Sequence, residues 1–103
     1  MVPAEPTEPT DDEKWLVVDG RRWRRTDPAI PEDELARLKS HLGRGRSGVR
    51  TASGDAELAA TRRRTRLAKV GLGERGPKWW EQTEAERRER WESALAELDA
   101  LDD

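Results

Sequence analysis

The dipeptide Asp19-Gly20 constrains this chain more than any other feature of its sequence. A two-residue type I′ turn needs positive φ angles at both positions, and Asp followed by Gly is one of the pairs that adopt them most readily. The four residues before the pair are aromatic or aliphatic, and the four after it contain Trp23. We therefore predict an antiparallel β-hairpin over residues 15–24 with this pair at its tip.

The register of the hairpin divides its side chains between two faces. With the Asp-Gly pair as the loop, Val18 lies opposite Arg21, and side chains alternate between the faces along each strand. One face then carries Leu16, Val18 and Trp23, and the other carries Trp15, Val17, Arg22 and Arg24. Because an isolated hairpin is only marginally stable in water, we expect the face with Trp23 to pack on helices and the face with Trp15 to remain open to a ligand.

The first predicted helix begins near Pro31, a residue that suits the first helical position. The acidic residues 32–34 complement the positive N-terminal end of a helix. Leucines recur at helical spacing as far as Leu42, and Gly43 is placed to end the helix. We expect the glycines within residues 43–54 to form a loop before the next helix.

The second helix is expected to be capped by Asp55 and to run to about Val70. Its spacing places Arg62, Arg66 and Lys69 on one face. The segment that follows is too rich in Gly and Pro for regular structure, although it contains a pair of tryptophans. We expect one ring of this pair to pack against the hairpin and the other to lie at the surface.

The third helix has the clearest start, because Thr83 and Glu86 form a capping box. Trp91, Leu95 and Leu98 follow at helical spacing. The fold class that these elements predict is α+β, with one antiparallel hairpin packed on about three helices. We divide the chain into a disordered acidic tail (residues 1–13), a compact unit of the hairpin and two helices (14–81) and a C-terminal amphipathic acidic helix (82–103).

Composition limits the classes to which the protein can belong. A chain of 103 residues suits one domain, and with 33% hydrophobic against 41% charged residues its core must be thin. It has no cysteine for a disulfide staple, no basic leader before an apolar run, and no stretch of about 18 apolar residues. We therefore expect a cytoplasmic protein that does not associate with membranes.

Charge is distributed unevenly along the chain. Residues 20–80 carry sixteen basic and seven acidic side chains, whereas residues 1–19 and 81–103 are strongly acidic. A basic centre of this kind favours an anionic partner, or else it is neutralised by the acidic ends folding back on it. Both alternatives remain open at the level of sequence.

Three spaced motifs carry a resemblance. They are Trp15-x-Val17-Val18-Asp19-Gly20-Arg21-x-Trp23-Arg24, Thr26-Asp27-Pro28-x-Ile30-Pro31 and Leu72-Gly73-Glu74-Arg75-Gly76-x-x-Trp79-Trp80. The pattern, which covers roughly residues 14–81, resembles a set of small proteins of high-GC bacteria whose function is unknown, some of them automatically labelled "biopolymer transporter Tol". The resemblance implies a recurring compact unit and no particular activity. The label has no physical support here, because such a transporter subunit needs a membrane anchor.

The residues that usually carry catalysis are sparse. His41 is the only histidine, there is no cysteine, and no serine stands in a nucleophile motif, so we expect no enzyme activity, no metal and no cofactor. We expect His41 to be a surface or capping residue near the C-terminal end of its helix. Residues 43–48 match the letters of a dinucleotide-binding fingerprint, but they follow a helix and no βαβ unit surrounds them.

Arginine-rich segments favour a small accessory protein that binds DNA or RNA through phosphates, largely without regard to sequence. The candidate contacts are Arg21, Arg22, Arg24, Arg44, Arg46, Arg62, Arg64 and Arg66. The structural alternative is that these side chains pair with acidic residues of the flanking segments.

The second functional hypothesis is a protein-interaction adaptor that uses exposed tryptophans and the C-terminal helix, which suits docking in a groove or self-association. Its candidate contacts are Trp15, Trp80, Trp91, Leu95 and Leu98. The sequence leaves both the identity of the partner and the oligomeric state open.

Overall fold

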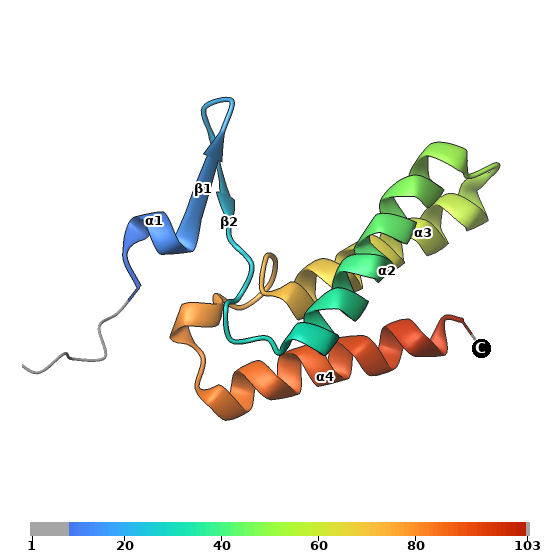
Figure 1. Ribbon diagram of the computed structural model, residues 1–103. Coiled ribbons are helices and arrows are strands. Elements are labelled where there is room, and N and C mark those ends of the chain that lie inside the picture. The colour runs from blue at the N-terminus through green and yellow to red at the C-terminus, as the bar shows by residue number, and fades with distance from the viewer. Residues whose placement is uncertain (1–8, 103) are drawn as a thin grey trace, which may run out of the picture.

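A two-stranded antiparallel sheet and three long helices build residues 9–102, the part of the chain that the computed structural model describes (Figure 1). In chain order the elements are α1 (Asp11–Lys14), β1 (Trp15–Val18), β2 (Arg21–Arg24), α2 (Glu32–Thr51), α3 (Asp55–Leu72), the 3₁₀ turn η1 (Trp79–Glu81) and α4 (Glu84–Ala100). This is the predicted α+β class. No helix within residues 9–102 is long and apolar enough to cross a membrane.

The hairpin has the predicted turn and register. Asp19 and Gly20 have φ angles of 52° and 79°, and Leu16 pairs with Trp23. The short helix α1 precedes β1 and begins with a capping box between Thr10 and Glu13. The prediction of a disordered tail over residues 1–13 is therefore wrong for residues 11–13, which lie in α1. Residues 1–8 lie outside the described part of the chain.

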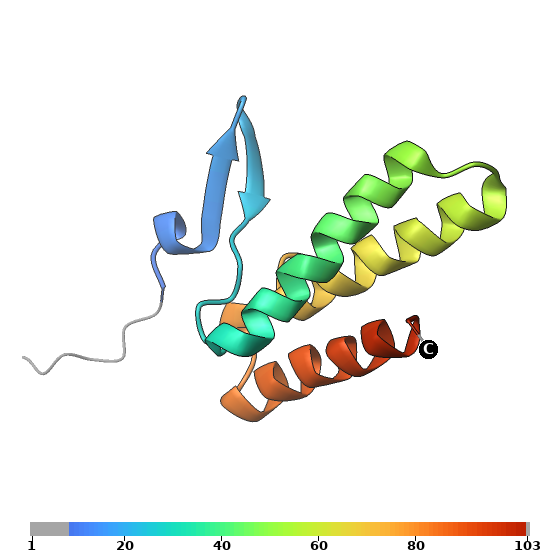
Figure 2. The ribbon, with the colours of Figure 1, turned by 45° about the vertical axis from the view of Figure 1, so that its right-hand side comes forward.

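Helix α2 passes through the predicted glycine loop and ends only at Thr51, so the prediction that Gly43 ends it is wrong. The reason lies in the neighbouring helix, because α2 and α3 run side by side in both views (Figures 1 and 2). A Cβ atom added to Gly45 would lie 2.3 Å from Thr65 Oγ1, and one added to Gly48 would lie 2.4 Å from Thr61 Cγ2. These two glycines let the helices approach closely.

This contact predicts opposite effects for two neighbouring substitutions. A Cβ at Gly43 would meet nothing within 4 Å. Gly43→Ala should therefore stabilise the protein by about 0.5–1 kcal/mol through helix propensity. Gly45→Ala should destabilise it by about 1–3 kcal/mol, because the methyl group would push α3 away. Urea denaturation followed by circular dichroism measures both, and stabilisation by Gly45→Ala would contradict the close packing.

A short connection, residues 52–54, replaces the expected loop. Helix α3 then begins at Asp55, with Gly54 rather than Asp55 at the capping position, and it ends at Gly73, whose φ of 82° is left-handed. A Cβ on Gly73 would lie 3.1 Å from the Trp79 ring and 3.2 Å from Asp27. Glycine is thus required here both by conformation and by the side chains packed against it.

The predicted capping box opens α4. Thr83 Oγ1 accepts from the Glu86 amide at 3.1 Å, and the Glu86 carboxylate accepts from the Thr83 amide at 2.8 Å. Helix α4 crosses the α2–α3 pair (Figures 1 and 2), and the three helices enclose the core. Its buried members are Ile30, Leu38, Leu42, Ala68, Leu72, Trp91, Ala94, Leu95 and Leu98.

This core corrects one predicted site. Trp91, Leu95 and Leu98, expected to contact a partner, are all buried between the helices, with Trp91 only 5% exposed. The predicted boundary near residue 81 therefore does not divide the protein into two separately packed parts. Helix α4 contributes its side chains to the same core as α2 and α3.

The two faces of the hairpin also differ from the prediction. Leu16, Val18 and Trp23, assigned to the core, are exposed, with Trp23 at 45%. The Trp15 ring, assigned to the ligand face, lies 5.5 Å from the Trp80 ring in edge-to-face geometry. The physical reason is that the helical core is already closed by its own leucines and Trp91, without the side chains of the hairpin.

Candidate functional site

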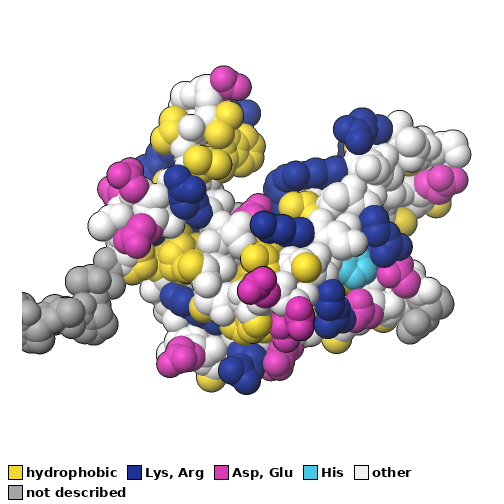
Figure 3. Space-filling view, in the orientation of Figure 1, with side chains coloured by type: hydrophobic (Ala, Val, Ile, Leu, Met, Phe, Trp, Pro, Cys, Tyr) yellow, Lys and Arg dark blue, Asp and Glu magenta, His cyan; other side chains and the backbone are white. Residues whose placement is uncertain are grey.

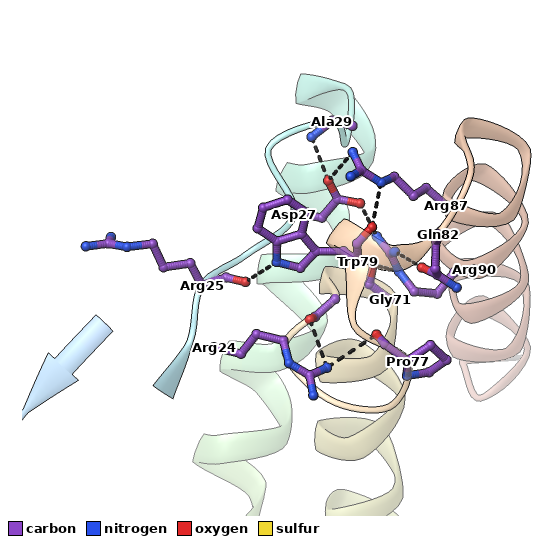
Figure 4. A network of polar contacts seen from close by, with 11 residues as sticks. Arg24, Arg25, Asp27, Ala29, Gly71, Pro77, Trp79, Gln82, Arg87 and Arg90 are labelled. Carbon is purple, nitrogen blue, oxygen red and sulfur yellow. Dashed lines mark hydrogen bonds and ion pairs between the residues drawn. The ribbon is translucent and has the colours of Figure 1, made fainter. Parts of the chain in front are cut away.

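A buried carboxylate fixes the hairpin to the helices. Asp27 follows β2 and is 1% exposed. Its Oδ2 accepts from Arg90 Nη2 at 2.6 Å, and its Oδ1 accepts from Arg87 Nη1 at 3.4 Å and from the Ala29 amide at 2.8 Å (Figure 4). The Asp27 amide donates to the carbonyl of Leu72 at 2.9 Å. One residue thus ties together the segment after the hairpin, the end of α3 and the start of α4.

Arg90 and Arg87 have their own supports. Arg90 donates to the Gly71 carbonyl at 3.2 Å and to Gln82 Oε1 at 2.5 Å. Arg87 donates to the Trp79 carbonyl at 2.8 Å. No sequence pattern pointed to this network, because its arginines stand in an ordinary charged helix.

Two further contacts hold the base of the hairpin. Trp79 is buried, and its Nε1 donates to the Arg25 carbonyl at 2.9 Å (Figure 4). Arg24, predicted to contact a ligand, donates to the Gly76 carbonyl at 2.8 Å and more weakly to that of Pro77. Trp80 packs half-buried against Trp15 of the hairpin, as expected of one ring of the pair, but the expectation that the other ring lies at the surface is wrong, because Trp79 is buried.

The arrangement leaves a cleft of about 820 Å³ between the hairpin and the helices. In Figure 3, hydrophobic side chains gather on the side of the hairpin toward the helices, and Lys and Arg side chains lie on the helical surface across the gap. We call this hollow the cationic cleft. Its lining residues are Trp15, Leu16, Val18, Arg22, Trp23, Arg24, Arg25, Thr26, Arg46, Lys69, Glu74 and Arg75.

The helical wall of the cationic cleft concentrates positive charge. Arg46 comes from α2, Lys69 from α3 and Arg75 from the loop after α3. None of the three forms an ion pair with an acidic residue in the described part of the chain. Partial burial lowers the pKa of Lys69, and the nearby Arg75 and Arg46 lower that pKa further, against an opposing influence of Glu74. The three cations therefore repel one another, and an anion would relieve that repulsion.

The hairpin wall carries apolar and aromatic side chains beside Arg22 and Arg24. Leu16, Val18 and Trp23 line it, and the guanidinium of Arg21 lies 5.2 Å from the centre of the Trp23 ring. The one carboxylate in the cleft, Glu74, accepts a hydrogen bond from Thr26 Oγ1 at 2.6 Å. The cleft therefore joins a flat aromatic surface to cations that pair with no acidic residue among residues 9–102.

The structure separates the eight arginines of the nucleic-acid prediction. Arg44 and Arg64 share one carboxylate, that of Asp102, at 2.8 Å, and so pair with a flanking acidic residue as the structural alternative proposed. Arg22, Arg24 and Arg46 all line the cleft. Of these three, Arg24 also donates hydrogen bonds to carbonyls of the loop after α3. The exposed members without an ion pair to residues 9–102 are Arg21, Arg22, Arg46, Arg62 and Arg66.

Lys69 and Arg75 were absent from that set. For Lys69 the sequence did contain a signal, the helical spacing that places it on one face with Arg62 and Arg66. Arg75 stands in an irregular segment, where sequence periodicity gives no orientation.

The expectation that His41 lies at the surface is wrong. Its side chain is buried, with Nδ1 2.7 Å from Arg64 Nη1 and Nε2 3.2 Å from Asp99 Oδ1. Arg64 is a donor, so Nδ1 accepts and Nε2 carries the proton toward Asp99. His41 thus helps to tie α2 and α3 to the end of α4.

Acid should weaken the junction at Asp102. Hydrogen bonds from Arg44 and Arg64 hold the pKa of this carboxyl well below its usual range. Because the pKa of Asp102 is lower in the folded than in the unfolded state, the ionised carboxylate stabilises the folded protein above about pH 4, the ordinary pKa of Asp. This stabilisation disappears as pH falls through the folded-state pKa. We expect Asp102→Asn to melt below wild type at neutral pH and the two melting curves to converge in acid. Thermal denaturation across the pH range measures the melting temperatures of both proteins. Asp19→Asn, in the exposed turn, is the control. If the melting temperatures of Asp102→Asn and wild type changed in parallel with pH, the prediction would be contradicted.

A second hollow lies between α3 and α4, away from the cationic cleft. It has a volume of about 920 Å³, and its apolar lining includes Leu67, Val70, Ala85 and Ala94. Its acidic lining residues are Glu81, Glu86, Glu89 and Glu97. We call it the acidic groove. The two hollows are opposite in charge, so an anionic ligand is favoured at the first and disfavoured at the second.

No group of three or more His, Asp or Glu side chains among residues 9–102 is arranged to hold a metal ion. Comparison with protein-family models, curated proteins and solved structures finds no match to this chain. The candidate site therefore has to be interpreted from its own chemistry.

Proposed function

We propose that this protein is a small, non-enzymatic accessory protein that binds nucleic acid through its cationic cleft. The observation that carries the proposal is the convergence of Arg46, Lys69 and Arg75 with no acidic partner among the described residues. Cations that converge without neutralisation suit phosphates, whose binding releases condensed counterions. Arg62 and Arg66, on the same face of α3 as Lys69, extend the positive surface beyond the cleft.

Binding is proposed to be largely independent of sequence. Base edges are commonly recognised by the amides of Asn and Gln, alongside arginine. The chain has no asparagine, and its one glutamine, Gln82, is bonded to Arg90. The lack of cysteine fits the reducing cytoplasm, where we place the protein.

The test is fluorescence anisotropy with labelled oligonucleotides at about 50 and 200 mM salt. Wild type should bind at low salt and weaken steeply as salt rises. Replacing Arg46, Lys69 and Arg75 together by Ala should reduce the slope of log affinity against log salt by about 2 to 3, because about three phosphate contacts are lost. No binding by wild type at low salt would disprove the proposal.

A matched control removes the same charge from the other side of the molecule. Arg37 and Arg63 pair with Asp99 and Glu97 of α4, and Arg88 lies exposed on α4 itself. Replacing these three by Ala should leave the salt slope within about one unit of wild type. Equal losses in the two triple variants would show that net charge, rather than the cationic cleft, governs binding.

The acidic groove supports a second candidate function, adaptor binding to a basic amphipathic helix of a partner protein. Leu67 and Val70 offer apolar contacts, and the glutamates at the rim complement Lys and Arg side chains. A labelled helical peptide of Leu and Lys, with its leucines on one face, should bind more tightly than a shuffled peptide of the same composition. Equal binding of both peptides, or no effect of Leu67→Asp, would remove this candidate.

A further inference from the structure

The apolar side chains of the hairpin wall have no role in a purely electrostatic contact. Leu16 is 42% and Trp23 45% exposed, although both point toward the helices across the cleft. Exposed apolar side chains grouped in a concave site usually mark a contact surface. The ligand of this cleft therefore needs an apolar, flat part as well as negative charge.

Nucleic acid presents these two features together only where bases are unpaired. In a duplex the bases stack on one another, and the outer surface that meets a protein is mainly phosphate and sugar. A single strand exposes the faces of its bases, which stack on aromatic side chains while the backbone follows a positive groove. The volume of about 820 Å³ is in the range of a small-molecule site, which suits a few nucleotides better than the side of a duplex.

We propose that the cationic cleft binds single-stranded nucleic acid, with an unpaired base stacked on Trp23 and the adjoining phosphates held by Arg46, Lys69 and Arg75. This inference rests on the proposed function and adds the strand state and the stacking residue. Arg21 lies over one side of the Trp23 ring, so the base takes the other side. Stacking is sequence-tolerant because every base has a flat face, which agrees with the absence of Asn and Gln from the lining of the cleft.

The experiment compares three probes of equal length on the intact chain: oligothymidylate, a blunt duplex, and an abasic strand that keeps the phosphates without the bases. Wild type should bind oligothymidylate at least about ten-fold more tightly than the other two. Trp23→Ala should lose about 5- to 150-fold of its affinity for oligothymidylate, the equivalent of one stacked base. It should lose little for the abasic strand. Trp23→Phe should retain most of the binding.

The variants should fold, because the Trp23 side chain is largely outside the core, and circular dichroism checks this. Val17→Ala, on the opposite face of the hairpin and 65% exposed, is the matched control and should bind as wild type. Equal affinity for duplex and single strand, with no effect of Trp23→Ala, would overturn this inference and leave the proposed function in place. Absence of binding to every probe at low salt would overturn both.

Discussion

Asp27→Ala should lower the free energy of unfolding by about 3–5 kcal/mol, because it leaves the buried guanidinium of Arg90 without its counter-charge. The loss is large because Asp27 and Arg90 are both almost inaccessible to water, at 1% and 7% exposure. A charge in that position has no solvent to replace its partner. Small domains have about 5–15 kcal/mol of total stability, so the variant should be close to unfolding at ordinary temperatures.

Two comparisons give this result its meaning. Asp27→Asn keeps an acceptor for the Ala29 amide and should lose less than Asp27→Ala. Asp33→Ala removes an exposed carboxylate from the first turn of α2 and should cost about 0.3–1 kcal/mol. Urea denaturation followed by circular dichroism gives all three values. A loss below about 1 kcal/mol for Asp27→Ala would show that water reaches this carboxylate, in conflict with the structure.

A double-mutant cycle tests the pairing itself. Arg90→Met removes the charge and keeps an apolar side chain of comparable length. Because Asp27→Ala leaves the buried charge of Arg90 without its partner and the double variant removes that charge as well, the double variant should be less destabilised than the sum of the singles, by at least about 1 kcal/mol. Additive effects would mean that Asp27 and Arg90 stabilise the fold independently of each other.

Local chemistry made several elements predictable. The turn at Asp19-Gly20 needs only the φ preferences of two residues, and the register of the hairpin follows from it. The capping box at Thr83 and Glu86 is likewise a contact between residues three apart. Such features are written in short stretches of sequence and do not depend on the rest of the fold.

The errors arise where a residue's role depends on a distant segment. Gly45 and Gly48 were expected in a loop, yet they lie within α2, where Thr65 and Thr61 of α3 pack directly over them. Glycine disfavours a helix by about 1 kcal/mol, a cost that close packing of two helices offsets. Nothing within residues 43–48 indicates that partner.

The sequence indicated that the site would be a group of positive charges, but it did not indicate which residues form that group. The excess of arginine in the centre of the chain indicated an anionic ligand, and Arg22 and Arg46 do line the cationic cleft. Which arginines are neutralised depends on where α4 lies. The carboxylate of Asp102, just after α4, reaches Arg44 and Arg64, whereas Arg46 has no acidic partner among residues 9–102. That division is a property of the tertiary structure.

Trp91→Ala should destabilise the protein by about 3–5 kcal/mol, whereas Trp23→Ala should change its stability by at most about 0.5 kcal/mol. The sequence suggests the reverse, since Trp23 was expected in the core and Trp91 at a partner. In the structure Trp91 is 5% exposed and packs among α2, α3 and α4, while Trp23 borders an open cleft. The Trp91 ring therefore leaves a large cavity when removed, and the Trp23 ring leaves none.

This pair of variants also tests whether the cationic cleft exists in solution. If the hairpin closed onto the helices, Trp23 would be buried, and Trp23→Ala would cost as much as a core substitution. Equal losses for the two variants in urea denaturation would therefore remove the cleft, and the single-strand site with it. A large loss for Trp91→Ala beside a negligible one for Trp23→Ala would show that the tryptophan of β2 is held at the surface without contributing to the stability of the fold. A side chain that is kept exposed at no benefit to folding is available to bind a ligand.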